Sequence, residues 1–393
     1  MRNWPNEFGR ACATISLLLC WPLAAQVKTP AVALLDASDA VQWQNWTRQL
    51  GWQVIAPAGL PASDIDSRVR ALATAVEAAI QSGSVDPARV YIAGRGDAGG
   101  AVFYAVSRVP DLWAAGAALG GSPKAAIDTN RVFTANFTNV PMLWISGEDA
   151  KPMVEKLTAA KLNLEWQPVS SGAGAEPLIQ WLARHQRDAF PLSIDCETNS
   201  PAFARCYWIQ PTKFDANERN DVLPATRIPG GTGAALDLGG FVFKTDDPGP
   251  GVLVTSLPEK YSGPLKTGDR LFALDGKPLA SARQYLELME KVTEEKPAVV
   301  TVQRGKERIR METRIMLPRR ESGVTSRVEA QYLPAEKEIQ IVSRTITEMR
   351  VTVAPEWLPA TLLWNGLTLE NLKEAGCWVL SVHKELLRAE KCK

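Results

Sequence analysis

Histidine is the side chain that most often serves as a general base or metal ligand near neutral pH. It occurs only twice in these 393 residues, at His185 and His383. A mechanism of the usual kind must therefore use one of these residues or proceed without an imidazole. We interpret both as surface residues, His185 near the end of a helix predicted over 177–188 and His383 in the last β segment. No Cys-x-x-Cys motif and no histidine accompanies the cysteines, so the sequence indicates no metal site and no cofactor.

The first 25 residues have the pattern of a secretory signal peptide. Positive charges precede an apolar run over 11–21, and small residues follow at Ala24 and Ala25. The apolar run is about half the ~20 residues that span a bilayer, so we expect cleavage and no stable transmembrane anchor. Cys20 leaves lipoprotein processing as an alternative. The sequence thus predicts an exported protein, periplasmic or extracellular.

Four cysteines remain after residues 1–25 are removed: Cys196, Cys206, Cys377 and Cys392. An even number in an exported chain favours disulfides. Proximity in sequence favours Cys196–Cys206 and Cys377–Cys392, although four cysteines allow three pairings. The formal charge of +1 becomes zero when two arginines and one glutamate leave with the signal. This balance excludes a basic nucleic-acid or membrane surface as the theme of the whole chain.

Residues 28–189 alternate short apolar runs with amphipathic stretches, which predicts a mostly parallel sheet with helices on both faces. The clearest helix covers 64–81, where Val69, Leu72 and Val76 share one face and Gly83 follows the end. The expected strands are 31–37, 52–58, 89–94, 114–119, 141–146 and 164–169.

Within this region, residues 85–100 resemble the strand and nucleophile elbow of α/β-hydrolases, specifically the esterase and polyester-depolymerase branch. The resemblance is carried by Val85-Asp86-Pro87-Ala88-Arg89-Val90-Tyr91-Ile92-Ala93-Gly94, by Gly99-Gly100 and by Pro110-Asp111-Leu112-Trp113-Ala114-Ala115. In that family a Gly-x-Ser-x-Gly turn presents the nucleophile. The turn here reads Gly94-Arg95-Gly96-Asp97-Ala98, so Gly96 stands at the nucleophile position and has no side chain with which to attack.

The remaining functional positions of the family are altered as well. Asp149 matches the acid, but Ala175, in Ala173-Gly174-Ala175-Glu176-Pro177, stands where the family has its histidine. Leu34-Leu35-Asp36-Ala37 replaces the His-Gly of the oxyanion loop. The resemblance therefore implies a degenerate site at Gly96, Asp149 and Ala175 without its chemistry.

Asp97 is the alternative nucleophile. It would serve only if the turn shifted by one residue, which places Arg95 where a small residue is needed, and no base would accompany it. The simpler interpretation is a solvated aspartate at the start of a helix.

Residues 234–317 resemble bacterial PDZ domains. The specific block is Gly268-Asp269-Arg270-Leu271-Phe272-Ala273-Leu274-Asp275-Gly276-Lys277-Pro278-Leu279, preceded by Gly251-Val252-Leu253-Val254-Thr255-Ser256-Leu257. A helix over 281–291 and a hairpin of 299–304 with 308–315 would complete the domain. The resemblance implies that a peptide C-terminus adds as a strand at a sheet edge. The residues implied to form that site are Leu238, Gly239, Gly240, Phe241, Phe243, Tyr285 and Met289.

Residues 190–229 and 322–393 alternate apolar and polar residues as half-buried strands do, with a strong turn signal at Asn365-Gly366. We expect a small β-sandwich-like module that carries the PDZ-like unit as an insertion, and Cys206-Tyr207-Trp208-Ile209 resembles its opening strand. The fold class expected for the chain is thus α/β plus mainly-β.

These features favour an exported, non-catalytic binding or scaffold protein that recognises peptide or protein C-termini and has no nucleic-acid partner. One alternative is an esterase-like hydrolase with a non-standard constellation such as Asp97 with Asp149. Another is a binder of polysaccharide or polyester, since exposed tryptophans stack on sugars and eleven remain after residue 25. We expect most of these tryptophans to lie in the core.

Overall fold

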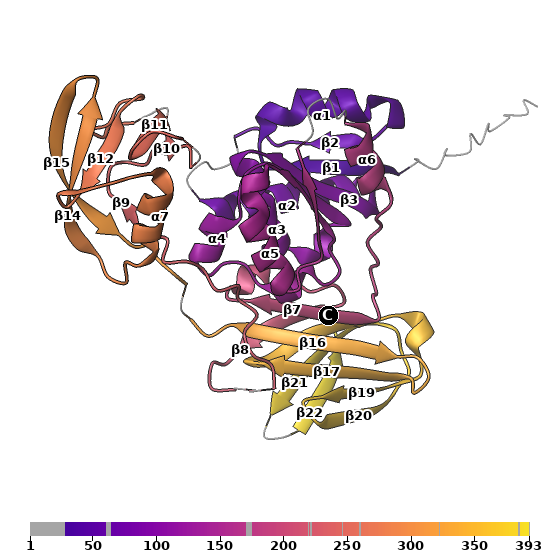
Figure 1. Cartoon of the computed structure of the whole chain (residues 1–393). Coiled ribbons are helices and arrows are strands. Elements are labelled where there is room, and N and C mark those ends of the chain that lie inside the picture. Colours follow the sequence, from indigo (N-terminus) through magenta and orange to yellow (C-terminus); the bar gives the residue numbers. More distant parts are fainter. Residues whose placement is uncertain are drawn as a thin grey trace, which may run out of the picture.

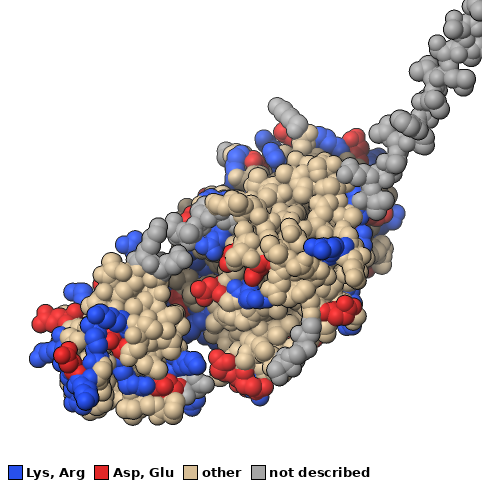
Figure 2. Space-filling model, turned by 90° about the horizontal axis from the view of Figure 1, so that it is seen from above, with Lys and Arg blue, Asp and Glu red and all other residues tan. Residues whose placement is uncertain are grey.

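The computed structural model describes residues 28–59, 64–169, 175–218, 220, 222–245, 247–258, 261–321, 323–383 and 386–392. The predicted signal peptide lies outside these residues. The chain forms three parts, which we call the α/β region, the 234–317 module and the sandwich (Figure 1). No helix within the described ranges has the length and apolar character needed to cross a bilayer. On the face shown in Figure 2, basic and acidic side chains lie near one another.

The α/β region is built on a six-stranded parallel sheet in the order β2-β1-β3-β4-β5-β6. This confirms the predicted parallel sheet and each of its six strands. Their bounds are β1 Thr29–Leu34, β2 Gln53–Ile55, β3 Val85–Arg95, β4 Ala115–Leu119, β5 Met142–Ser146 and β6 Leu164–Pro168.

Helices cover both faces of this sheet, as the alternation of β1 shows. Ala31 and Ala33 belong to one buried cluster with α2, α3 and α5, whereas Val32 and Leu34 belong to another with α1 and α6. The helices are α1 Ala40–Thr47, α2 Ile65–Gln81, α3 Asp97–Arg108, α4 Lys124–Asp128, α5 Lys151–Ala159 and α6 Glu176–Ala183. Helix α2 begins where expected because the Asp64 carboxylate accepts the N–H groups of Asp66 and Ser67. The helix predicted over 177–188 is shorter and ends at Ala183.

The 234–317 module has a sheet in the order β10-β11-β12-β14-β15-β9, with β13 paired to β12 and one helix, α7. The bounds are β9 Ala235–Leu236, β10 Val242–Phe243, β11 Val252–Ser256, β12 Arg270–Leu274, β13 Lys277–Pro278, α7 Ala282–Glu290, β14 Lys296–Arg304 and β15 Glu307–Met316. Ser281 caps α7 by accepting the Gln284 N–H at 3.2 Å. Asp275 and Gly276 both have positive φ, as the turn predicted there requires.

The sandwich consists of two sheets, β20-β19-β17-β16-β7 and β22-β21-β18-β8, which share one buried core. Strands β7 and β8 precede the 234–317 module in sequence, and the other strands follow it. The bounds are β7 Ser193–Thr198, β8 Ile209–Phe214, β16 Ser326–Leu333, β17 Glu338–Arg344, β18 Ile346–Val353, β19 Ala360–Trp364, β20 Leu367–Leu372, β21 Gly376–His383 and β22 Leu386–Lys391. The strand expected at 206–209 is instead a tight turn closed between Cys206 and Ile209, with Tyr207 at φ 53°.

Both expected disulfides are present. Cys196 and Cys206 join β7 to that turn with a Cα separation of 6.0 Å, and Cys377 and Cys392 join β21 to the chain after β22 at 5.4 Å. The three pairings that the sequence left open thus reduce to one.

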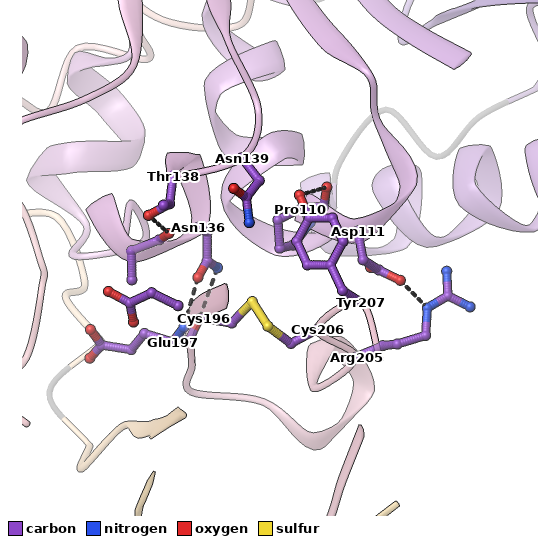
Figure 3. The surroundings of a disulfide bond; sticks show 12 residues. Pro110, Asp111, Asn136, Thr138, Asn139, Cys196, Glu197, Arg205, Cys206 and Tyr207 are labelled. Carbon is purple, nitrogen blue, oxygen red and sulfur yellow. Dashed lines mark hydrogen bonds and ion pairs between the residues drawn. A yellow bond between two sulfur atoms is a disulfide. The ribbon is translucent and has the colours of Figure 1, made fainter. Parts of the chain in front are cut away.

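Polar contacts on either side of the Cys196–Cys206 disulfide attach the sandwich to the α/β region (Figure 3). Asn136 donates to the Glu197 carbonyl at 2.9 Å and accepts the Glu197 N–H at 2.7 Å, so its amide pairs with the free edge of β7. On the other side, Arg205 forms an ion pair with the buried Asp111. Burial raises the pKa of Asp111, and the positive charge of Arg205 opposes that rise.

Candidate functional site

Gly96 lies at the sharp turn between β3 and α3, with φ 55° and ψ −127°. Its N–H donates to the Leu119 carbonyl at 2.9 Å, which fixes the turn against the end of β4. Glycines surround the turn because the backbones approach closely: a Cβ at Gly94 would clash with the Ala98 carbonyl, and one at Gly99 would lie 2.7 Å from the Gly120 oxygen. The strand-to-helix turn that the resemblance implied at Gly96 is therefore formed.

The space beside Gly96 is open. A Cβ built at this residue meets no heavy atom within 4 Å, and Gly96 and Asp97 are both exposed. The turn thus keeps the geometry that presents a side chain, but the residue at its apex has none to present.

Asp149 and Ala175 lie at the same edge of the sheet as Gly96. Asp149 is exposed just after β5, and Ala175 precedes α6, which follows β6. The carboxyl ends of parallel strands share one edge, so the three positions that the hydrolase resemblance singled out lie along that edge. The residues of the Gly-rich segment that precede Ala175, 170–174, lie outside the described ranges.

His185 lies away from this edge. Its carbonyl accepts the Tyr91 hydroxyl at 3.1 Å, and Tyr91 precedes Gly96 by five residues, about 16 Å of strand. The expectation of a plain surface residue is corrected: His185 is half-buried against Trp181, with ring centroids 4.4 Å apart, and burial lowers its pKa. His383 is exposed at the end of β21 in the sandwich. Neither imidazole belongs to the Gly96 site.

The position of the family's oxyanion loop carries charge instead of a His-Gly turn. The Asp36 carboxylate accepts the Ser38 N–H at 2.9 Å, and this hydrogen bond lowers the pKa of Asp36. Arg95, the residue before Gly96, reaches across to Gln42 and lies 4.0 Å from the Asp39 carboxylate. Of these contacts, Arg95–Asp39 is an ion pair, and the others are hydrogen bonds to a backbone N–H and to a neutral amide.

A second candidate site lies between β10 and α7 in the 234–317 module. Strand β10 pairs with β11 on one side, and no described strand pairs with its other edge. The loop before β10 contains Gly239 and Gly240, both exposed, with φ 79° and 78°. The Phe243 ring packs edge-on against Tyr285 of α7 at 5.8 Å. An edge strand, a glycine loop and a helix thus border one face.

The other predicted residues of this site are more deeply placed. Leu238, Tyr285 and Met289 are each at most 3% exposed and belong to the core of the module, while Phe241 and Phe243 are half-buried beside it. Burial raises the pKa of Tyr285 to about 12, so its hydroxyl stays neutral.

Sequence reasoning missed one feature near both sites. Asp97 and Ser122 line two adjoining cavities of about 490 and 390 Å³, and α7 of the module contributes to the larger one. These cavities form through contacts between segments far apart in sequence. The Gly120-Gly121-Ser122 turn after β4 is therefore the one local feature of the sequence that points to them. All eleven described tryptophans are buried or half-buried, as expected for core residues.

Comparison with known proteins gives a limited result. No protein-family model matches the sequence, and no curated protein matches it. Among solved structures, a thermostable esterase aligns at 16% identity with a TM-score of 0.32, covering 42% of this chain and 57% of the esterase. A variant of Arabidopsis thaliana SOBER1 aligns at 16% identity and 0.31, covering 40% and 99%. Esterase PE8 aligns at 15% identity and 0.30, covering 42% and 94%.

Proposed function

We propose that this protein is an exported binding protein in which the 234–317 module, a PDZ-like unit, captures the C-terminus of a peptide or protein. The α/β region acts as a non-catalytic, hydrolase-like support. The observation that carries the proposal is the free edge of β10, bordered by the Gly239–Gly240 loop and by α7.

Each element has a role in this mode of binding. An extended peptide adds to the edge of β10 through main-chain hydrogen bonds. The backbone N–H groups around Gly239 and Gly240 receive the terminal carboxylate, since positive φ and the absence of side chains permit a close approach. Phe243 and Tyr285 form an apolar floor for the last side chain.

Hydrolysis is not proposed for the α/β region. Gly96 carries no nucleophile, Ala175 carries no base, and both histidines lie elsewhere. The turn at Gly96 keeps its shape but presents no nucleophile. We therefore assign the α/β region a supporting role beside the 234–317 module.

A screen of the full-length mature chain against free C-terminal peptides tests the proposal. We expect binders tighter than about 100 μM whose affinity falls at least tenfold when the terminal carboxylate is amidated. Phe243→Ala removes the apolar floor and should abolish binding. Phe272→Ala is the matched control, because Phe272 is also half-buried in the module but packs on Arg308 at 4.3 Å, away from α7. A library without binders, or equal loss in both variants, would contradict the proposal.

A further inference from the structure

A cavity of about 490 Å³ lies where the α/β region meets the 234–317 module. The start of α3 and helix α4 line it from one side, and α7 lines it from the other. Figure 1 shows α4 and α7 facing each other across this junction. The volume is within the range of small-molecule sites, which often form between domains. We call this space the junction cavity.

The two linkers to the module hold the walls of the junction cavity in a defined arrangement. Gly230 approaches α4 so closely that a Cβ would lie 2.7 Å from the Asp128 Cα. In the returning linker, the Glu321 N–H donates to the Thr129 carbonyl at 3.1 Å. Gly233 and Pro318 bring the linkers side by side, since a Cβ at Gly233 would lie 2.7 Å from the proline ring. The cavity is therefore bounded by packed backbone and not by loose segments.

The lining combines an apolar floor with unpaired negative charge. Half-buried Leu286 of α7 supplies apolar surface, and the buried Met289 lies beneath it at the cavity wall. Asp97 projects from the start of α3 and Glu290 from the last turn of α7, and within the described chain neither carboxylate has a hydrogen bond or ion pair. Among the described residues that line the cavity, Lys124 is the one cation, and it is already paired with Asp128.

We propose that the junction cavity binds an alkylammonium or alkylguanidinium group, with its apolar stem on Leu286 and Met289 and its cationic head between Asp97 and Glu290. Two unpaired carboxylates on opposite walls attract a cation and oppose an anion. The C-terminal end of α7 adds partial negative charge next to Glu290. A long cationic side chain has the required shape, because its stem packs on apolar surface while its head stays polar.

This proposal is independent of C-terminal peptide recognition and gives Asp97 a role in binding in place of catalysis. The cationic group could belong to a free amine or to a Lys or Arg side chain of a docked protein. The two sources are separated by comparing hexylammonium with a short lysine-containing peptide that is amidated at its C-terminus.

The test uses the full chain labelled with 13C-methyl methionine, with the Met289 signal assigned through Met289→Leu. We expect hexylammonium to shift the Met289 methyl resonance with a Kd of about 1 mM, while exposed Met316 on β15 stays unchanged. Hexanol and hexanoate have the same stem without the positive charge and should shift it far less. Asp97→Asn and Glu290→Gln should each weaken hexylammonium at least threefold, as loss of one partially solvated ion pair predicts.

Glu312→Gln is the matched control, because Glu312 is an exposed carboxylate on β15 outside the cavity. Tighter binding of the lysine peptide than of hexylammonium would assign the site to a protein side chain, and the reverse would assign it to a free amine; either supports the proposal. Equal shifts with hexanol, or no Met289 shift at about 20 mM hexylammonium, would overturn it.

Discussion

Replacement of Asn136 by alanine should be the most damaging single change at the junction of the α/β region with the sandwich. Asn136 is 3% exposed and bonds both backbone groups of Glu197 at the free edge of β7, and it also donates to the Ser107 carbonyl. Alanine leaves these three buried backbone groups without their partner. At about 1–3 kcal/mol for each unsatisfied group, partly relieved by relaxation, we expect a loss of about 3–5 kcal/mol.

Asn139→Ala provides a matched control. Asn139 lies in the same segment as Asn136 (Figure 3). Its side chain donates to the Ser193 carbonyl, also on β7, at 2.9 Å, and this hydrogen bond is solvent-exposed. Water can replace it, so we expect a loss below about 1 kcal/mol. Urea unfolding followed by tryptophan fluorescence compares the two variants, and hydrogen exchange at Glu197 reports the local effect. Equal, small losses of unfolding free energy in both variants would refute the assignment of Asn136 as the main polar contact between the α/β region and the sandwich.

Three further changes test other parts of the structure. Burial alone would raise the pKa of Asp269, but hydrogen bonds from Arg304 and the Lys266 N–H bring it below 3.8. This carboxylate therefore stabilises the 234–317 module above about pH 4, and the stabilisation is lost as the pH falls through the folded-state pKa. Protection of β12 from hydrogen exchange should fall in acid, and Asp269→Asn should remove this dependence on pH. Replacing both Cys377 and Cys392 by alanine opens a cross-link spanning 15 residues and should lower stability by about 3 kcal/mol in thermal unfolding under non-reducing conditions. A side-chain Cβ at Gly96 meets no heavy atom within 4 Å, but the positive φ of 55° strains any residue other than glycine there. We therefore expect Gly96→Ser to give a folded protein of lower stability with no turnover of nitrophenyl esters, whereas measurable turnover would show that a base had been overlooked.

The sequence predicts most of the α/β region because its signals are local. The inner strands β1, β4 and β5 are largely continuous apolar runs, and Asp64 marks the start of α2 through its own side-chain hydrogen bonds. The turn at Gly96 was implied by the hydrolase resemblance, and it includes Gly94, Gly99 and Gly100 because close backbone contacts leave no room for a side chain there. The early end of α6 at Ala183 was not predicted, because no glycine or proline follows it.

The features that were missed depend on tertiary contacts. No sequence pattern distinguishes Asn136. Its contribution to stability depends on the hydrogen bonds that it forms with β7 in the folded chain. The turn at Cys206 replaces a strand because the disulfide and the left-handed Tyr207 close it. The junction cavity joins Asp97 to Glu290, which are almost two hundred residues apart, so no local spacing could indicate it.

The most direct test of the central claim is hydrogen–deuterium exchange of the full chain with and without a C-terminal peptide from the screen. The account predicts slower exchange in the segment 238–243, which contains the glycine loop and β10, and no such protection with the amidated peptide. Protection confined to another sheet edge, such as β9 or β20, or identical protection by the amidated peptide, would contradict capture of a C-terminus at β10.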